Sequence, residues 1–284
     1  MGGRKMKRAL KIVSFIDVIF LLVLMLSGSL GGTASSVVYY LAFFIPVAIG
    51  FYYSRELKYE REEERGLFEA VDKYFHLDKQ SLLDLLPLIA PSVLCVFLLA
   101  ALTSVLLSAL GFSNPQPESR GILTMLLVHA LCPAVLEELL FRYIPMKLLA
   151  PYSKRWCVIF SSMFFALIHA NLFQMPYAFF AGVIFMSVNL AFNSVLPSLI
   201  LHFLNNAASV VWMKYCSGSE AKIVFVSVLI LLTVISLAFV FARRDRYKSY
   251  LRSSLDVGAP EFDWRAPISL IVISMYIALS SLVL

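Results

Sequence analysis

The sequence predicts an all-α membrane protein, a polytopic bundle of about eight or nine transmembrane helices. Of its 284 residues, 60% are hydrophobic and only 15% are charged, and the mean hydropathy is +0.83. Soluble domains are about 45–50% apolar and about 25% charged. Apolar runs recur from one end of the chain to the other. A water-soluble globule, a soluble domain with one anchor and a disordered or collagen-like chain are therefore excluded.

Nine apolar stretches are candidates to cross the hydrocarbon core as helices, which takes about 20 residues. They are Ile12–Leu30, Ser35–Tyr53, Leu85–Leu110, Gly121–Met146, Trp156–Ala170, Pro176–Phe192, Val195–Met213, Ile223–Ala242 and Pro267–Leu284. The fifth and sixth stretches are short. We expect their ends to lie in a cavity lined by protein, where irregular backbone is tolerated.

The first stretch has two interpretations, a signal peptide or a retained helix. Basic residues precede it and the segment Gly-Gly-Thr-Ala-Ser follows it, as in a signal peptide. However, Asp17 interrupts the apolar run and no clean A-x-A cleavage site appears, so we expect a retained helix. Asp17 and Asp84 are both expected to reach the membrane interface near the ends of their spans.

The distribution of basic residues predicts the orientation of the chain. When the spans alternate from a cytoplasmic N-terminus, the cytoplasmic segments hold 20 of the 24 Lys and Arg residues, and the outside loops hold only 3. This is a strong positive-inside signal, and it explains the net charge of +6 without a nucleic-acid partner. The basic segments are Met1–Lys11, Ser54–Lys79, Lys147–Arg155 and Arg243–Arg265. The N-terminus is thus expected inside and the C-terminus outside.

Two charged segments and the lack of repeats complete the outline. Ser54–Lys79 carries both signs of charge, which is typical of a solvated helix with i,i+4 pairs; a docking surface is the alternative. Arg243–Lys248 is expected at the inner surface, where basic residues attract anionic lipid. No internal repeat or glycine-rich phosphate loop is visible, so residues 1–284 are expected to form a single domain.

The four cysteines show no metal-binding or disulfide pattern. No pair has C-x-x-C spacing, and three of them fall inside apolar runs. We interpret them as small core residues. They are Cys95, Cys132, Cys157 and Cys216.

Ionisable groups inside the spans are the main functional candidates, because such groups are costly in a membrane. Glu137, Glu138 and Arg142 lie in the fourth span. Glu138 and Arg142 are four residues apart, so the carboxylate is expected to hold the guanidinium. The adjacent Glu137 points about 100° away around the helix and should have a different role. A buried ion-pair network that locks helices together is the alternative.

Histidines in other spans lie at a matching depth. By helical rise, Glu137, His169 and His202 are each roughly 10–20 Å from the cytoplasmic ends of their stretches. Asn206 is four residues after His202 and faces the same neighbour. His129 and Asn205 are interpreted as core or packing residues. One carboxylate, two imidazoles and a carboxamide are thus expected to converge in one cavity.

This set of side chains suits amide hydrolysis in either of two ways. A desolvated glutamate is a general base toward water, and a neighbouring histidine can hold the same water. The other histidine and the asparagine amide are suitable donors to a developing oxyanion. Alternatively, Glu137, His169 and His202 form a common zinc-ligand set with an open position for water. The residues alone leave both routes open.

Three motifs together resemble the CPBP intramembrane endopeptidases, which include type II CAAX prenyl proteases and bacteriocin-processing and immunity proteins. E-E-x-x-x-R is matched by Glu137, Glu138 and Arg142, F-x-x-x-H by Phe165 and His169, and H-x-x-x-N by His202 and Asn206. Each motif alone is weak, but their order on separate spans is fairly specific. The resemblance covers about 121–213, the expected catalytic core.

The resemblance implies an all-α membrane fold with a cavity open to the cytoplasm, and it implies roles for the motif residues. Glu137 and His169 would activate water, His202 and Asn206 would stabilise the oxyanion, and Glu138 and Arg142 would support the site. The family is often described as metal-dependent, so zinc is a possible cofactor. The extra apolar stretch from Pro267 is not expected of a minimal member.

The leading functional prediction is an intramembrane endopeptidase that cleaves a membrane-associated or lipid-anchored peptide or protein. The alternative is a non-catalytic immunity or scaffold protein of the same family. A proton- or ion-coupled transporter ranks last, because no paired broken helices or repeat halves are seen. The lack of a long glycosylated loop or retention signal favours a bacterial plasma membrane. Neither the substrate nor prenylation can be deduced from the sequence.

Overall fold

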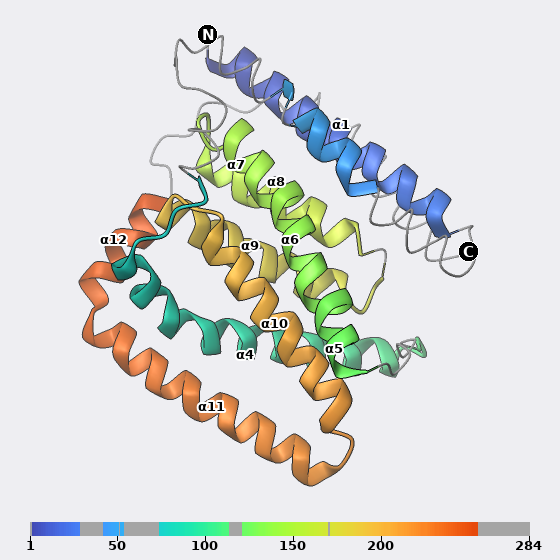
Figure 1. The fold of residues 1–284 in the computed structure, drawn as a ribbon, viewed down its shortest axis with the longest axis vertical. Helices are drawn as coiled ribbons and strands as arrows, with labels where there is room; N and C mark the ends of the chain where they lie inside the picture. The colour runs from blue at the N-terminus through green and yellow to red at the C-terminus, as the bar shows by residue number, and fades with distance from the viewer. Residues whose placement is uncertain are drawn as a thin grey trace.

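The computed structural model describes residues 2–28, 42–50, 52–53, 74–113, 121–169 and 171–254. Helices are the regular secondary structure of this part of the chain, and the long ones form a bundle (Figure 1). The predicted all-α class is therefore confirmed for these residues. Predictions for Pro267–Leu284, for most of Ser54–Lys79 and for residues 35–41 lie outside the described residues.

Five helices are long and apolar enough to cross a membrane, which makes the chain a multi-pass membrane protein. They are α4 (Lys79–Ala109), the continuous helix Ile122–Leu148, α9 (Met175–Phe192), α10 (Leu196–Tyr215) and α11 (Ser219–Ala242). They correspond to five of the nine predicted spans.

Two other predicted spans are helical but are not among these five. The fifth is α8 (Lys154–Leu167), which has 14 residues. At 1.5 Å per residue it is about 21 Å long, too short for a hydrocarbon core of about 30 Å. The first predicted span lies largely within α1 (Gly2–Gly28). Phe20 of α1 contacts the rings of Phe43 and Phe141, with centroids 4.4 and 6.0 Å away, so α1 packs on the bundle.

Two prolines divide the helix Ile122–Leu148. It runs through α5 (Ile122–Met125), the π-helical turn η1 (Leu126–Leu131), α6 (Cys132–Glu138), the π-helical turn η2 (Leu139–Tyr143) and α7 (Ile144–Leu148). Each π turn ends two residues before a proline, Pro133 or Pro145. Proline has no amide hydrogen to donate to the carbonyl four residues earlier. For Pro145 that carbonyl belongs to Phe141, and the Ser161 hydroxyl of α8 donates to it instead.

Small and polar residues set the spacing of the helices around this broken one. A Cβ atom at Gly182 of α9 would lie 2.8 Å from the Cα atom of Ser162, so α8 and α9 approach closely only because this residue is glycine. Asn189 joins α9 to α10: its Nδ2 donates to the Ser198 hydroxyl at 2.7 Å, and its Oδ1 accepts from the Ser198 amide at 2.9 Å. Both partners are fully buried.

Asp84 of α4 is buried, and it anchors the surface helix α12 (Arg244–Ser254). One carboxylate oxygen lies 2.6 Å from Nε of Arg246 and accepts from the Tyr250 hydroxyl at 2.7 Å. The other lies 3.7 Å from Nη1 of Arg243. We call Asp84, Arg243, Arg246 and Tyr250 the anchor cluster. Asp84 lies near the start of its span, as expected, and α12 covers its carboxylate.

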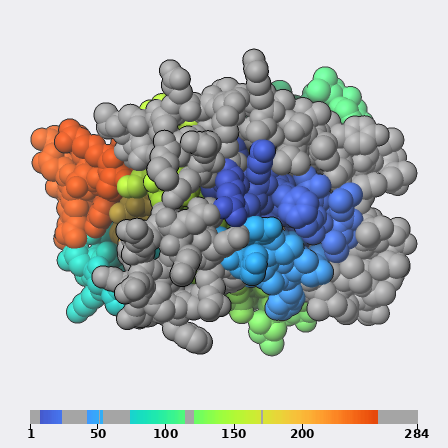
Figure 2. All heavy atoms as spheres, turned by 90° about the horizontal axis from the view of Figure 1, so that it is seen from above, coloured from blue at the N-terminus to red at the C-terminus, as the bar shows by residue number. Residues whose placement is uncertain are grey.

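The structure gathers several predicted cytoplasmic segments at one end of the bundle. Figure 2 shows α12 and the chain leading into α4 side by side at one edge. Lys154, which begins α8, donates to the carbonyl of Ser253, and the ring of Phe192 stacks 4.7 Å from that of Tyr250. If the spans alternate from a cytoplasmic N-terminus, these segments must lie on the same side of the membrane, as they do here. The side of the membrane on which this end lies stays a prediction.

One smaller prediction needs correction. Cys157 and Cys216 are buried, but Cys95 is exposed on α4, so the core interpretation is wrong for it. Asp17 is 2% exposed among buried neighbours of α1, and its expected position at the interface stays a prediction.

Candidate active site

Glu138 lies between Arg142 and His202 in the interior of the bundle. Its Oε1 is 3.3 Å from Nη1 of Arg142, one turn along the same helix. The same oxygen is 2.8 Å from Nδ1 of His202 on α10. Glu138 and Arg142 are fully buried and His202 is 4% exposed. The predicted pairing of Glu138 with Arg142 is confirmed, and the contact with His202 joins it to another helix.

Glu137 faces the opposite side of the same imidazole. Its Oε2 lies 3.7 Å from Nε2 of His202. The adjacent glutamates therefore meet one imidazole from two sides, and the expectation that they have different roles stays a prediction. Their side chains diverge, but each is long enough to reach one of the two ring nitrogens, which lie on different edges of the ring. We call Glu137, Glu138, Arg142 and His202 the buried cluster.

Two phenylalanine rings hold this cluster in place. The guanidinium of Arg142 lies 3.9 Å from the centroid of Phe165, a cation–π contact. Phe165 also meets the His202 ring edge-on, with centroids 5.5 Å apart. Phe185 of α9 stacks on His202, with centroids 5.3 Å apart and planes inclined by 30°. Together the rings fix the imidazole plane and exclude other side chains from its faces.

His169 approaches the cluster through Phe165. Its Nδ1 lies 2.8 Å from the carbonyl oxygen of Phe165, to which it donates, so Nε2 remains for chemistry. Its ring centroid is 5.0 Å from that of Phe165. The His202 centroid lies 5.5 Å from the same Phe165 ring. The centroids of the two imidazoles are therefore no further apart than the sum of these two distances.

Asn206 follows His202 by one turn on α10 and is half-buried. Asn205 is 6% exposed, as expected of a packing residue, and its side-chain Oδ1 is buried without a hydrogen-bond partner among the described residues. His129 is exposed on η1, so its interpretation as a core residue is wrong.

Several polar atoms of the buried cluster lack hydrogen-bond partners within the described residues. They are Oε2 of Glu138 and Nε and Nη2 of Arg142. Leaving a buried donor or acceptor unsatisfied costs about 1–3 kcal/mol, and more for a charged group. The site is therefore a place where a polar ligand or water would gain hydrogen bonds.

The described residues contain no group of three or more His, Cys, Asp or Glu side chains arranged to hold a metal ion. Nδ1 of His202 already faces Glu138, and only Glu137 faces its Nε2. Three protein ligands plus water are typical of catalytic zinc. The arrangement of the described residues does not fit that set.

Comparison with known families gives the class of the site. Residues 119–208 match the family model for type II CAAX prenyl endopeptidase Rce1-like proteins, so this segment is a domain of that family. The match contains all the motif residues and nearly coincides with the predicted core at 121–213. No curated protein and no solved structure shows a significant similarity to the chain.

Sequence reasoning missed three features of the site. Phe185 looks like any other aromatic residue in an apolar span, so no signal distinguished it. The Tyr177 phenol of α9 interacts electrostatically with Glu137, and the sequence did not single it out either. The third feature is the pair of π turns on either side of α6. Pro133 and Pro145, in an otherwise apolar span, were the sequence signal that could have predicted them.

Proposed function

We propose that the protein is an intramembrane endopeptidase that hydrolyses a peptide bond in a membrane-associated or lipid-anchored peptide or protein. The main observation is the buried pair of the Glu137 carboxyl and the His202 imidazole, 3.7 Å apart, within an Rce1-like domain. A base next to a potential proton donor, away from bulk water, suits general acid–base catalysis. The family supports a peptide or protein substrate.

The charges of the buried cluster leave one proton to be shared. Arg142 and Glu138 neutralise each other, and Glu138 accepts the Nδ1 hydrogen of His202. Nε2 of His202 and Oε2 of Glu137 then face each other, and a single proton resides on one or the other. Glu138 is in this scheme a positioning residue, since it fixes which ring nitrogen is turned toward Glu137.

Hydrolysis follows from this arrangement in two stages. Glu137 removes a proton from a water molecule held with Nε2 of His169, and the water oxygen attacks the carbonyl carbon of the substrate. His202 and Asn206 donate to the oxyanion that forms. The carbon–nitrogen bond then breaks, and the proton held by Glu137 passes to the leaving amine. These roles require the side chains of His169 and Asn206 to turn toward the pair when substrate is bound.

A zinc-dependent version would use Glu137, His169 and His202 as ligands, and it makes a different prediction. Extensive dialysis of the purified protein against a strong chelator would abolish cleavage, and added zinc would restore it. In the route proposed above, chelation leaves the cleavage rate unchanged.

The test compares peptide termini in membranes of cells that express the wild type, Glu137→Gln or Glu220→Gln at matched protein levels. Glu137→Gln preserves size but removes the base, so termini produced by the wild type should disappear. Glu220 lies at the exposed start of α11, and its replacement should leave them unchanged. Persistence of the termini in Glu137→Gln would refute the mechanism, provided that the variant is folded.

A non-catalytic immunity or scaffold protein is the second candidate. It is favoured by the contacts of Glu138 with Arg142 and His202, which can lock the helix Ile122–Leu148 to α10 without any chemistry. Such a protein keeps its function when His169 is replaced by Ala, whereas the peptidase loses it. In a cell assay of peptide immunity, this variant therefore separates the two functions.

A further inference from the structure

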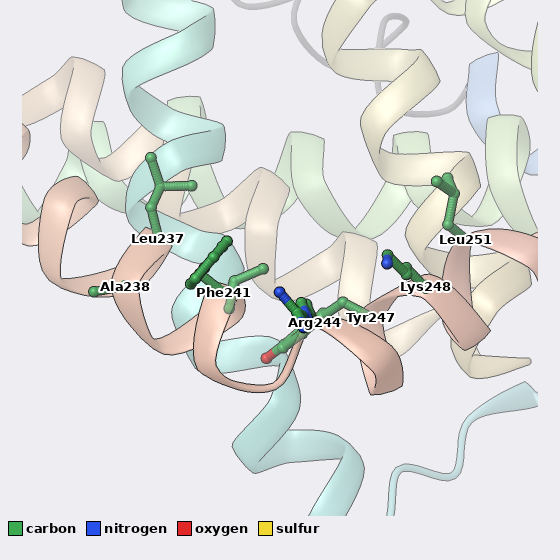
Figure 3. A pocket seen from close by; sticks show the side chains of 8 residues that line it. Leu237, Ala238, Phe241, Arg244, Tyr247, Lys248 and Leu251 are labelled. Carbon is green, nitrogen blue, oxygen red and sulfur yellow. The ribbon is translucent and has the colours of Figure 1, made fainter.

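A hollow of about 650 Å³ lies at the corner between α11 and α12, away from the buried cluster. Figure 3 shows its side chains coming from the last turns of α11 and one side of α12. Ligand pockets are typically about 300–1,000 Å³. The lining residues are Leu237, Ala238, Val240, Phe241, Arg244, Tyr247, Lys248 and Leu251.

The two sides of α12 have different tasks. Arg246 and Tyr250 hold Asp84 in the anchor cluster. Arg244, Lys248 and Leu251 lie roughly 140–200° away from Arg246 around the helix, at 100° per residue, and line the hollow. The cations of the hollow are therefore not engaged by the buried carboxylate.

Tyr247 connects these two sides. Its hydroxyl donates to the backbone carbonyl of Asp84 at 2.9 Å, while its side chain lines the hollow. Burial, together with the Asp84 charge, raises the pKa of Tyr247 to about 12, so the hydroxyl stays protonated at neutral pH. The contact holds this wall of the hollow against the first turns of α4.

The walls of the hollow are apolar on α11 and basic at the corner. Leu237 is 52% exposed, Phe241 70% and Leu251 59%. Arg244 begins α12, with its guanidinium 5.7 Å from the Phe241 ring. Lys248 is one turn further along α12, and its Nζ lies 4.0 Å from Oδ1 of the exposed Asp245. A surface ion pair of this kind contributes little.

The position of the hollow at the end of a membrane span determines which ligand fits. α11 is the most apolar span, and α12 carries four basic residues and one acidic residue. A molecule in the hollow therefore contacts apolar side chains along α11 and two cations, Arg244 and Lys248, at the end of this span. Phospholipids have this layout, and basic residues at membrane surfaces favour anionic headgroups.

We infer that the α11–α12 corner binds an anionic phospholipid, with its phosphate between Arg244 and Lys248 and an acyl chain along Leu237 and Phe241. The site is independent of the proposed peptidase activity. Its complementarity to an anionic headgroup comes from the two cations, which a zwitterionic headgroup would satisfy less well because it carries its own positive charge.

The test uses the full-length protein in detergent, titrated with phosphatidylglycerol or phosphatidylcholine and followed by native mass spectrometry. The wild type should retain phosphatidylglycerol in preference to phosphatidylcholine. The double variant Arg244→Gln/Lys248→Gln should bind phosphatidylglycerol about tenfold more weakly, since each cation near an anionic headgroup contributes severalfold.

A matched control separates a site from general attraction. Lys79→Gln/Arg252→Gln removes the same charge from exposed residues at the same end of the bundle, outside the hollow. It should bind phosphatidylglycerol as the wild type does. Equal weakening in both double variants, or equal retention of the two lipids by the wild type, would overturn the inference.

A charge-preserving variant guards against misfolding. Arg244→Lys/Lys248→Arg should keep most of the phosphatidylglycerol binding, and all variants should show the thermal unfolding transition of the wild type, because the anchor cluster is untouched. If the glutamine variant unfolds earlier, the exchange variant carries the test, and loss of binding in that folded protein would contradict the inferred site.

Discussion

The protein contains two clusters built from the same kinds of groups, a carboxylate with arginine partners, in different surroundings. In the anchor cluster, Asp84 is fully buried, but Arg243 and Arg246 are 45% and 42% exposed. Its carboxylate accepts from Arg246, from Tyr250 and, at 3.1 Å, from Gln80. In the buried cluster, by contrast, both Glu138 and Arg142 are inaccessible to solvent.

The difference lies in what each cluster leaves unsatisfied. The anchor carboxylate has hydrogen-bond donors at both oxygens, and its arginines keep contact with solvent. The buried cluster has hydrogen-bonding atoms without partners among the described residues. Such an arrangement is costly for stability. The first cluster therefore holds a helix in place, whereas the second keeps hydrogen-bonding atoms unsatisfied, as the proposed catalytic role requires.

Replacing Arg142 should have the largest effect on stability. Arg142→Met leaves the buried Glu138 charge without its cation, and breaking a buried pair costs about 3–5 kcal/mol. The free energy of unfolding in detergent should fall by this amount. The double variant Arg142→Met/Glu138→Gln should recover part of the loss, because it also removes the unpaired charge. A double variant no more stable than Arg142→Met would show that the ion pair is not the reason.

Replacing Glu138 should affect catalysis more than folding. Glu138→Gln removes the charge that selects the ring nitrogen of His202, and the wrong tautomer in a histidine-based site lowers the rate strongly. We expect kcat to fall by about 100-fold or more, with KM little changed. A steady-state cleavage assay measures both quantities. An increase in KM at constant kcat would instead indicate a role in binding substrate.

Breaking the anchor cluster should have a smaller and local effect. Asp84→Asn removes the charge held by Arg246, and hydrogen bonds to charged groups contribute about 1.5–3 kcal/mol, less where the partner is solvated. Hydrogen exchange of the amides in α12 should become at least tenfold faster, while the cleavage rate is retained.

Asp245→Asn is the matched control for this prediction. Asp245 is 90% exposed, and its pair with Lys248 is a surface contact. Exchange in α12 should therefore change little. Equal acceleration in the two variants would contradict the anchoring role of Asp84.

The smallest expected effect is at the start of α4. Asp78 caps this helix, accepting from the Ser81 amide at 2.8 Å and from its hydroxyl at 2.9 Å. These hydrogen bonds lower the pKa of Asp78. A depressed folded-state pKa stabilises the cap above the unfolded pKa, near 4, and this contribution is lost as the pH falls through the folded value.

Hydrogen exchange of the first turn of α4 should accordingly show extra fraying at acidic pH in the wild type, after correction for intrinsic exchange rates. In Asp78→Asn the cap is kept but does not titrate, so the extra fraying should disappear. The same acid-dependent fraying in this variant would assign it to another group.

The sequence predicted the class of the fold and the members of the site better than their arrangement. The apolar runs identified five long spans, since length and hydropathy are properties of each segment alone. The spacing of Glu138 and Arg142 likewise predicted their contact. It did not predict that Glu137 and Glu138 share His202, because this depends on how α10 is placed against α6. The link between Asp84 and α12 was missed for the same reason: its partners lie more than 150 residues away.

The sequence by itself therefore determined that the chain is a membrane protein and which long helices are candidates to cross the membrane. It also identified the polar side chains within these spans as functional candidates, because burying them in a bilayer is costly. These follow from local composition and helical periodicity. Only the tertiary structure decided that one carboxylate is covered by a surface helix while two others meet at a single imidazole between aromatic rings. Burial and the number of hydrogen-bond partners depend on neighbours distant in sequence, and these quantities distinguish an anchor from a candidate catalytic site.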